Sequence, residues 1–368
     1  MNVDGTHYQS VWFDETSDRI CYINQNFLPF RFVTEELISA EGAFRAIREM
    51  HIRGAPLIGV VAAFGMYLAV KESGAGTDPW VYIESWAERF TSARPTAINL
   101  EAAVNRVLTA LQRIPGNTKR LLATRNLALQ IMEEEKENCH RIGIYGRELI
   151  RELSKARKGK PVNILTHCNA GWLAAVDYGT ATAPVYLSHD EGIPVHVWVD
   201  ETRPRNQGAR LTAWELLRHG VPHTVIPDNT GGLLMQKGMV DLVITGADRV
   251  TMNSDVVNKI GTYLKALAAR DNSVPFYVAA PSSSIDFRND IPLSEIPIEE
   301  RGPDEIRFME GLADGKVQNF RIIPEENPVV NYGFDITPSR LITGIITERG
   351  ICPANMSALS DLFPGRTS

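Results

Sequence analysis

The sequence has few cysteines and none of the spacings that bind zinc or build a disulfide framework. Cys21, Cys139, Cys168 and Cys352 are scattered over 368 residues, and no two of them form a C-x-x-C pair. This distribution argues against a zinc site and against a small disulfide-stapled scaffold. A reducing cytoplasm is therefore the expected location.

Membrane-length apolar runs and an excess of positive charge are missing as well. The longest apolar run, residues 56–70, is shorter than the ~20 residues of a membrane-spanning helix and fits a buried core helix. The N-terminus is polar and acidic, unlike the basic-then-apolar plan of a signal peptide. The net charge of -6 gives no electrostatic reason to bind nucleic acid or an anionic membrane. We expect neither partner.

The motifs of the common cofactor enzymes are absent too. The chain contains no G-x-G-x-x-G fingerprint, no P-loop and no G-x-S-x-G elbow. His219 and His223 are four residues apart, but Gly220 and Pro222 would break a helix that presented them together to a metal. We therefore expect no cofactor and no metal.

The chain length suits two domains, and the sequence pattern changes once along the chain. Residues 10–24 alternate around a turn-rich D-E-T-S-D and predict a β-hairpin, and helical periodicity follows from Thr34 to about Leu153. The basic, glycine-containing stretch 154–161 is the expected junction. We predict a mainly helical N-terminal domain with a β-hairpin over residues 1–158 and a second domain over residues 159–368.

The second domain alternates short β-rich runs with helical stretches, which predicts an α/β fold. We expect a Rossmann-like, mostly parallel sheet with helices on both faces. The predicted strands lie in V-N-I-L-T-H-C, P-V-H-V-W-V-D-E-T, P-H-T-V-I-P-D-N, D-L-V-I-T-G-A-D, P-F-Y-V-A-A-P-S-S and R-L-I-T-G-I-I-T-E, and the first predicted helix lies in G-W-L-A-A-V-D-Y-G.

Polar residues follow the predicted strands at their carboxyl ends, where such sheets bind ligands. They are Cys168, Asp200 to Thr202, Asp228 and Asp248. Each has an ordinary explanation when taken singly. A strand-end cysteine is usually a small buried hydrophobic residue, and Asp248 suits a turn. By the same reasoning Gln207 would be a loop amide and Lys259 a helix-surface lysine. Their gathering on one edge of one sheet is what predicts a site.

Two arginines precede prolines in patterns that suit an anion. Arg53 stands before Gly54 and a helix whose first turn contains Pro56, and Arg94 precedes Pro95. A helix N-terminus with free amide groups and a flanking guanidinium can hold a phosphate. A surface arginine or a structural ion pair is the ordinary alternative for each.

Longer motifs give the chain a family resemblance over nearly its whole length. They include A-I-R-E-M-H-I-R-G-A-P-L-I-G, I-L-T-H-C-N-A-G, V-W-V-D-E-T-R-P-R-N-Q-G-A-R-L-T-A-W-E-L, I-T-G-A-D-R-V and N-K-I-G-T-Y. In these motifs and their order the chain resembles the methylthioribose-1-phosphate isomerases. These are aldose–ketose isomerases of methionine salvage, related to regulatory subunits of translation initiation factor 2B.

The resemblance implies roles for individual residues. Cys168 and Asp248 correspond to the catalytic residues of the family. The positions that correspond to substrate-binding residues are Arg53, Gly54, Ala55, Arg94, Gln207, Asn258 and Lys259. It also implies a homodimer, a sugar-phosphate substrate and no cofactor. One position departs from the family pattern, because Ser254 stands where the family usually has a glycine.

The chemistry implied by the resemblance places demands on Asp248 and Cys168. An aldose whose anomeric carbon carries a phosphate ester cannot open by losing a hemiacetal proton, so Asp248 would have to donate a proton to the ring oxygen. That role requires a raised carboxyl pKa, which an apolar surround produces. Hydrogen then moves from C2 to C1, either as a proton removed by a Cys168 thiolate or as a direct hydride shift.

The thiolate route requires a depressed cysteine pKa, and a helix starting after Asn169 would supply a reason for it. The sequence leaves both routes open. It also leaves open two sister substrates, 5-deoxyribose 1-phosphate and ribose 1,5-bisphosphate, and a non-catalytic regulatory subunit that binds sugar phosphates.

Overall fold

The chain begins with small antiparallel sheets that pack beside a group of helices. A computed structural model describes residues 1–74, 78–94, 96–288 and 292–366. The expected hairpin is confirmed, since β3 pairs with β4 between Ser10 and Asn24. The expected helical stretch begins later than Thr34, because residues 34–37 pair with β4 as a third strand. The bounds are β1 Asn2–Val3, β2 Thr6–His7, β3 Val11–Asp14, β4 Arg19–Ile23 and β5 Thr34–Leu37.

Five helices follow, and the second is the centre of the first core. Sixteen residues of α2, from Ala55 to Val70, are buried, because apolar residues surround the helix on all sides. By length and composition α2 resembles a membrane span, but 89% of that stretch is buried inside this fold, as in a core helix. The bounds are α1 Ala40–Arg48, α2 Ala55–Glu72, α3 Pro79–Ala93, α4 Ile98–Gln112 and α5 Asn117–Ala156.

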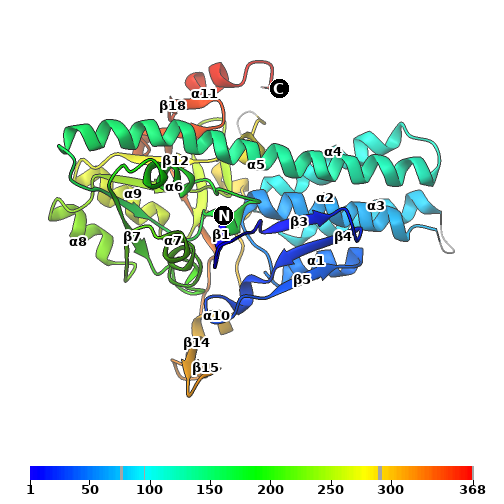
Figure 1. Cartoon of the computed structure of the whole chain (residues 1–368), viewed down its shortest axis with the longest axis horizontal. Coiled ribbons are helices and arrows are strands. Elements are labelled where there is room, and N and C mark those ends of the chain that lie inside the picture. Colours follow the sequence, from blue (N-terminus) through cyan, green and yellow to red (C-terminus); the bar gives the residue numbers. More distant parts are fainter. Residues whose placement is uncertain (75–77, 95, 289–291, 367–368) are drawn as a thin grey trace.

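Helix α5 runs along the whole length of the molecule (Figure 1). It packs against α2 near its start and against α6 further on. The expected domain boundary after residue 158 falls in the short connection between α5 and the next strand. Because α5 is continuous, it holds the helical part and the sheet part against each other.

The second part contains a seven-stranded sheet in the order β18-β17-β12-β9-β6-β7-β8, with helices on both faces. Its strands are parallel except β18, so the expected α/β fold with a mostly parallel sheet is confirmed. All six predicted strands are present. The bounds are β6 Val162–Thr166, β7 Val195–Asp200, β8 His223–Ile226, β9 Leu242–Thr245, β12 Phe276–Ala279, β17 Gly344–Thr347 and β18 Gly350–Pro353.

The first predicted helix of this part is not formed. No α-helix follows β6 directly. Residues 169–182 form an irregular buried segment that contains only the single 3₁₀ turn η2 (Trp172–Ala174). The helical bounds are α6 Ala183–Asp190, the π-turn η3 Gly208–Thr212, α7 Ala213–His219, α8 Thr230–Gln236, α9 Thr262–Asp271 and α11 Met356–Leu362.

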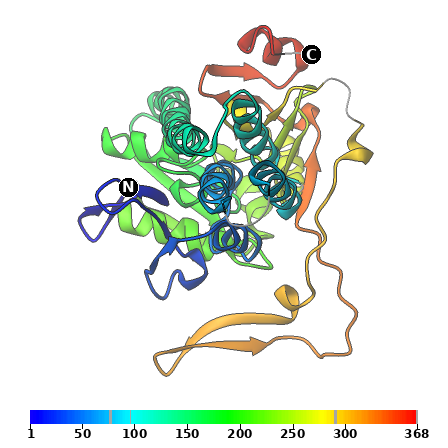
Figure 2. The same cartoon turned by 90° about the vertical axis from the view of Figure 1, so that its right-hand side faces the viewer.

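A second sheet and an arm complete the chain near the carboxyl ends of the strands. The small sheet has the order β13-β10-β11-β16. Between residue 292 and β16 the chain forms an extended arm that carries the β14–β15 hairpin at its far end (Figure 2). The bounds are β10 Arg249–Thr251, β11 Val256–Lys259, β13 Ile285–Asp286, α10 Asp304–Arg307, β14 Phe308–Ala313, β15 Lys316–Arg321 and β16 Phe334–Thr337; the remaining 3₁₀ turns are η1 Gln25–Phe27, η4 Ser282–Ser284, η5 Leu293–Glu295 and η6 Ser339–Leu341.

Candidate active site

One cavity collects the nine residues to which the sequence resemblance assigned catalysis or substrate binding. Its empty volume, which includes space open to solvent, is about 530 Å³. It lies where β6 and β9 end, at the point where the strand order of the sheet reverses. The nine predicted residues that line it are Arg53, Gly54, Ala55, Arg94, Cys168, Gln207, Asp248, Asn258 and Lys259.

The start of α2 forms one wall of the cavity. Gly54 is the N-cap and Pro56 lies in the first turn, as the sequence predicted. Gly54 has φ +106°, and a Cβ at this position would lie 2.4 Å from the Ala174 carbonyl oxygen. Only glycine allows this close approach. The open first turn of α2 therefore faces the cavity with free amide groups.

Three cationic side chains line the cavity, and each is largely buried. Arg53 donates to Asn169, at 2.7 Å to its side-chain oxygen and 2.6 Å to its carbonyl. Arg94 forms an ion pair of 3.1 Å with Glu299 of the arm. Lys259 donates to the Gly333 carbonyl at 3.0 Å. Lys259 lies on strand β11 and is not a helix-surface lysine. The helix expected to begin at Pro95 lies partly outside the described residues, and α4 begins at Ile98.

Cys168 lies directly after β6 in a left-handed backbone conformation, with φ +65°. Such a conformation is costly for a non-glycine residue, and two threonine side chains hold it here. The Cys168 amide donates to Thr202 Oγ1 at 2.8 Å, and Thr212 Oγ1 donates to the Cys168 carbonyl at 2.7 Å. The thiol lies 3.6 Å from Gln207 Oε1, to which it donates.

The Cys168 thiol does not have the depressed pKa that the thiolate route requires. Burial raises its pKa, and this effect outweighs the nearby charges of Arg53 and Lys259. The expected α-helix after Asn169 is absent, so no helix N-terminus compensates for burial. The resting side chain is therefore a neutral thiol at physiological pH.

Asp248 follows β9 and is half-buried, with its carboxyl group lining the cavity. Its backbone amide donates to Val257 at 2.9 Å, but no described side chain or amide donates to its carboxyl group. Burial raises the pKa of this carboxyl, although Lys259, Arg94 and Arg53 oppose the shift. The sequence-based expectation of a raised pKa is confirmed in direction.

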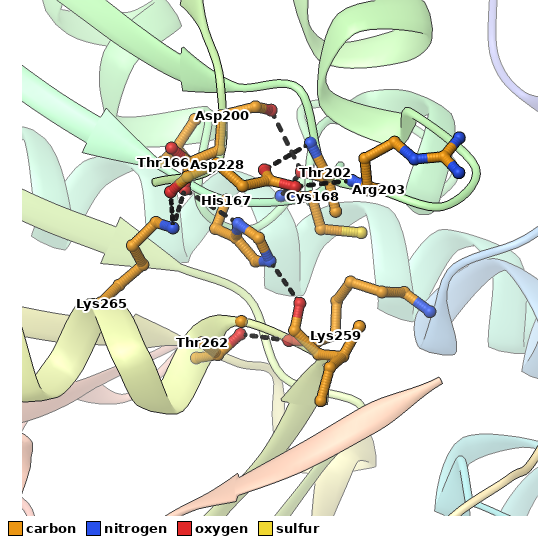
Figure 3. Close-up of polar contacts among 12 residues, drawn as sticks. Thr166, His167, Cys168, Asp200, Thr202, Arg203, Asp228, Lys259, Thr262 and Lys265 are labelled. Atoms are coloured by element: carbon orange, nitrogen blue, oxygen red, sulfur yellow. Dashed lines mark hydrogen bonds and ion pairs between the residues drawn. The ribbon is translucent and has the colours of Figure 1, made fainter. Parts of the chain in front are cut away.

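The other strand-end aspartates do not reach the cavity, contrary to the prediction. Asp200 accepts from His167 Nδ1 at 2.9 Å and lies 3.2 Å from the Lys265 ammonium (Figure 3). Asp228 accepts from the amides of Thr202 and Arg203 at 2.7 and 2.8 Å. These two carboxylates bind the backbone and side chains of the fold.

The same cluster brings ligand atoms of His167, Asp200 and Asp228 within 4.8 Å of one another. The Lys265 ammonium already lies against Asp200, and His167 Nε2 faces the Ile260 carbonyl at 2.8 Å. The Asp200 carboxylate is thus already paired with the Lys265 ammonium. We interpret it as the support of the Cys168 loop.

Comparison with known proteins places these features in a family. The model of the Initiation factor 2 subunit family matches residues 51–354. A methylthioribose-1-phosphate isomerase of Desulfatibacillum aliphaticivorans is 52% identical, with all of both chains covered. One of Rhodospirillum centenum is 54% identical, covering 99% of this chain and 96% of that protein. The chain belongs to the methylthioribose-1-phosphate isomerase family.

Solved structures agree with this assignment and also show a second branch. The crystal structure of 5-methylthioribose 1-phosphate isomerase from Pyrococcus horikoshii OT3 has a TM-score of 0.81 and 38% identity, covering 97% of this chain and 96% of that one. A structure titled translation initiation factor eIF-2B, subunit delta, from A. fulgidus has a TM-score of 0.78 and 34% identity, covering 97% and 99%. The fold is therefore common to isomerases and to proteins described as initiation factors.

The departure of this chain from the isomerase family pattern lies in a turn outside the cavity. Ser254 has φ +63° and lies in the turn between β10 and β11, where its amide donates to Thr251. The position demands a positive φ, which glycine adopts freely and serine adopts at a cost of roughly 1–2 kcal/mol. Ser254 does not line the cavity, so the substitution affects the turn and leaves the binding residues in place.

Three residues that support Arg53 and Arg94 were not predicted from the sequence. Asn169 and Glu215 support Arg53, and Glu299 of the arm supports Arg94. Asn169 and Glu215 do lie in the quoted motifs T-H-C-N-A-G and T-A-W-E-L, but neither was given a role. The signal available in the sequence was Glu215, a charged residue among the apolar residues of a predicted helix.

Proposed function

We propose that this protein is an isomerase that converts 5-methylthioribose 1-phosphate to 5-methylthioribulose 1-phosphate in methionine salvage. The observation that carries the proposal is the Asp248 carboxyl, which is unpartnered among the described residues, desolvated and in the same cavity as a neutral cysteine and three cations. A carboxyl of this kind can donate a proton, and the cations suit a phosphate ester.

In the proposed first step, protonated Asp248 donates its proton to the ring oxygen of the sugar. The bond between C1 and the ring oxygen breaks, and a positive charge develops at C1. Negative phosphate oxygens next to C1 stabilise this charge. Arg53, Arg94 and Lys259 would hold the phosphate together with the amides at the start of α2.

In the second step, we propose that hydrogen moves from C2 to C1 as a hydride. The C2 hydroxyl then loses its proton to the Asp248 carboxylate, which gives the C2 ketone and restores the acid. The neutral Cys168 thiol, held beside Gln207, supports this route over proton abstraction by a thiolate. With substrate deuterated at C2, the label should remain at C1 of the product, and exchange with solvent would contradict the hydride route.

The charge balance of the cavity supports a substrate with one phosphate. Arg53, Arg94 and Lys259 supply three positive charges, and Glu299 already neutralises part of the charge of Arg94. Ribose 1,5-bisphosphate would bring a second dianion that no further cation among the described lining residues matches. The remaining wall contains apolar groups that suit a methylthio substituent, among them Met50, Ala174 and Phe334.

The test of this proposal is a proton and phosphorus NMR time course with three substrates. They are 5-methylthioribose 1-phosphate, 5-deoxyribose 1-phosphate and ribose 1,5-bisphosphate. We expect a C2 ketone to form fastest from the first. If only one of the other two sugars reacted, the proposed isomerisation would stand, but its place in methionine salvage would not.

A regulatory subunit is the second candidate, because a structural neighbour of high similarity is described as an initiation factor subunit. A folded protein that binds sugar phosphates and isomerises none of them would favour that role. The presence of both Cys168 and Asp248 in the cavity favours the enzyme.

We also propose that the protein acts as a homodimer in the cytoplasm. The β14–β15 hairpin stands away from the body (Figure 2), and Leu312, Val317 and Phe320 are among its exposed residues by accessible surface. An isolated two-stranded hairpin with apolar side chains is only marginally stable in water. Contact with a second copy of the chain would therefore explain why this hairpin is ordered. All four cysteines are free, which suits a reducing compartment. Light scattering after size-exclusion chromatography would report the mass, and a monomer would contradict the dimer.

A further inference from the structure

Arg53 differs from the other buried arginines in the groups that it binds. Arg94 and Arg249 each lie within 4.0 Å of a carboxylate, Glu299 and Asp286 respectively. Arg53 is equally buried, but within the described residues it forms no such ion pair, and both of its hydrogen bonds go to neutral oxygens of Asn169. Its positive charge is therefore uncompensated by direct contact and remains available to an anion in the cavity.

The orientation of the Asn169 amide follows from its other partners. Its nitrogen donates to Glu215 Oε1 at 3.0 Å and to Thr212 Oγ1 at 3.1 Å. The Thr212 hydroxyl already donates its proton to the Cys168 carbonyl and can only accept from Asn169, so the amide nitrogen must face Thr212 and Glu215. The amide oxygen must then face Arg53, which is the arrangement that the guanidinium requires.

Glu215 is itself fixed by further donors and by a glycine. The Leu173 amide donates to Oε1 at 2.8 Å, and the Tyr186 hydroxyl donates to Oε2 at 2.9 Å. A Cβ at Gly171 would lie 1.6 Å from Oε2, so the carboxylate occupies space that only a glycine leaves open. Burial raises the pKa of Glu215 to about 7 despite these hydrogen bonds and the charge of Arg53.

We propose that Glu215 and Asn169 form a positioning relay that aims Arg53 at the substrate phosphate while leaving its charge free. The relay rests on the proposed function, because the anion is taken to be the phosphate of the sugar. Once ionised, above about pH 7, Glu215 balances the charge of Arg53 from one residue further away. A carboxylate in direct contact with Arg53 would compete with the phosphate for the guanidinium, and the neutral Asn169 amide avoids this competition.

Asn169→Asp is the variant that tests the relay, because it puts a carboxylate directly on Arg53. We expect KM for 5-methylthioribose 1-phosphate to rise at least about tenfold with kcat changed much less, as for a lost ground-state binding contact. Binding of inorganic phosphate, measured by calorimetry, should weaken in parallel. The new carboxylate would also face Glu215, so this variant is expected to lose stability.

A double variant that combines Asn169→Asp with Glu215→Gln separates binding from folding. The amide introduced at position 215 is neutral, so it faces the carboxylate introduced at position 169 without charge repulsion. This change removes the repulsion between two carboxylates, so the thermal midpoint should recover toward that of the wild type. KM should stay raised, because Arg53 is still neutralised.

Glu135→Gln is the matched control for these variants. Glu135 is also buried, with a pKa raised to about 7, but it does not line this cavity. The change therefore removes a comparable buried carboxyl without touching the relay. The KM of this control should equal that of the wild type.

Two results would overturn the relay. One is a double variant whose KM and phosphate affinity return to the wild-type values together with its stability. The other is a wild-type protein that binds no phosphate at all. If the wild type binds phosphate but turns over none of the sugars, the proposed function fails. The relay would then be tested by phosphate binding alone. Phosphate binding by Asn169→Asp as tight as that of the wild type would contradict it.

Discussion

Two groups of carboxylates lie at strand ends of the same sheet, and they differ in whether the fold already binds their oxygens. Asp200, the last residue of β7, binds His167 and Lys265 through Oδ2 and has no partner for its buried Oδ1 among the described residues, and Asp228, after β8, accepts from two backbone amides. Asp248, after β9, has no donor to its carboxyl group among the described residues and lines the cavity. Proximity to the site therefore does not identify the reactive carboxyl. A carboxyl group that lines the cavity and has no protein donor on either oxygen does.

The largest effect is expected from Asp248→Asn. Asparagine has the same shape and cannot donate an acidic proton, so kcat should fall by about 10³ to 10⁴. The carboxyl has no partner to lose among the described residues, so the free energy of unfolding should stay the same or rise. Turnover by NMR and thermal unfolding of the same sample measure both. An active Asp248→Asn would remove the acid from the mechanism.

Cys168→Ser should have the next largest effect. The serine hydroxyl is smaller and less polarisable than the thiol, and we expect kcat to fall about 10²-fold with a small change in KM. The backbone bonds that hold residue 168 come from Thr202 and Thr212 and are independent of the side chain. Unfolding should therefore be unchanged. Wild-type kcat in this variant would reduce Cys168 to a packing role.

Asp200→Asn should give the reverse of the Asp248 result. The change removes the carboxylate between His167 and Lys265 and leaves a buried ammonium without its partner, which costs about 3 kcal/mol of unfolding free energy. Activity should persist at low temperature, because no group of the cavity is lost. Denaturant unfolding and a low-temperature assay measure the two quantities. Full stability with abolished turnover would mean that the two groups of carboxylates are not distinct in function.

The smallest expected effect is on the pH dependence of stability. The folded protein keeps the proton of Glu215 up to about pH 7, whereas the unfolded chain releases it near 4.5. The folded state thus holds more protons in this window, and stability contributed by this group falls as pH rises from about 4.5 to 7. Glu215→Gln should flatten the slope by on the order of 1–3 kcal/mol across the window, and Glu135→Gln should do the same. An unchanged slope in both variants would contradict the raised pKa values.

Much of the site could be predicted from the sequence because its signals are local. The apolar runs that end in Cys168 and Asp248 mark strands, and Gly54 with Pro56 marks the start of α2. Strand ends of a parallel sheet meet at one edge, and together with the family motifs this allowed the nine lining residues to be assigned to one place before the fold was known.

The rest depends on partners far away in the chain. The segment after Asn169 has a composition that suits a helix, but its backbone groups form hydrogen bonds with residues far away in the sequence. Ser10 donates to the Val176 carbonyl, and the Leu173 amide donates to Glu215. Asp200 likewise does not line the cavity, because its carboxylate pairs with His167 and Lys265. Such long-range pairings leave no local pattern, and they override the propensity of the segment.

The most direct test of the account is a carbon-13 NMR titration of the Asp248 carboxyl. Protein labelled at the aspartate carboxyl carbons would be compared with the Asp248→Asn variant to assign the resonance. The account predicts that this carboxyl stays protonated to a pH above the ordinary range of aspartate. Ionisation in the ordinary range would contradict the role of Asp248 as the acid that opens the sugar ring.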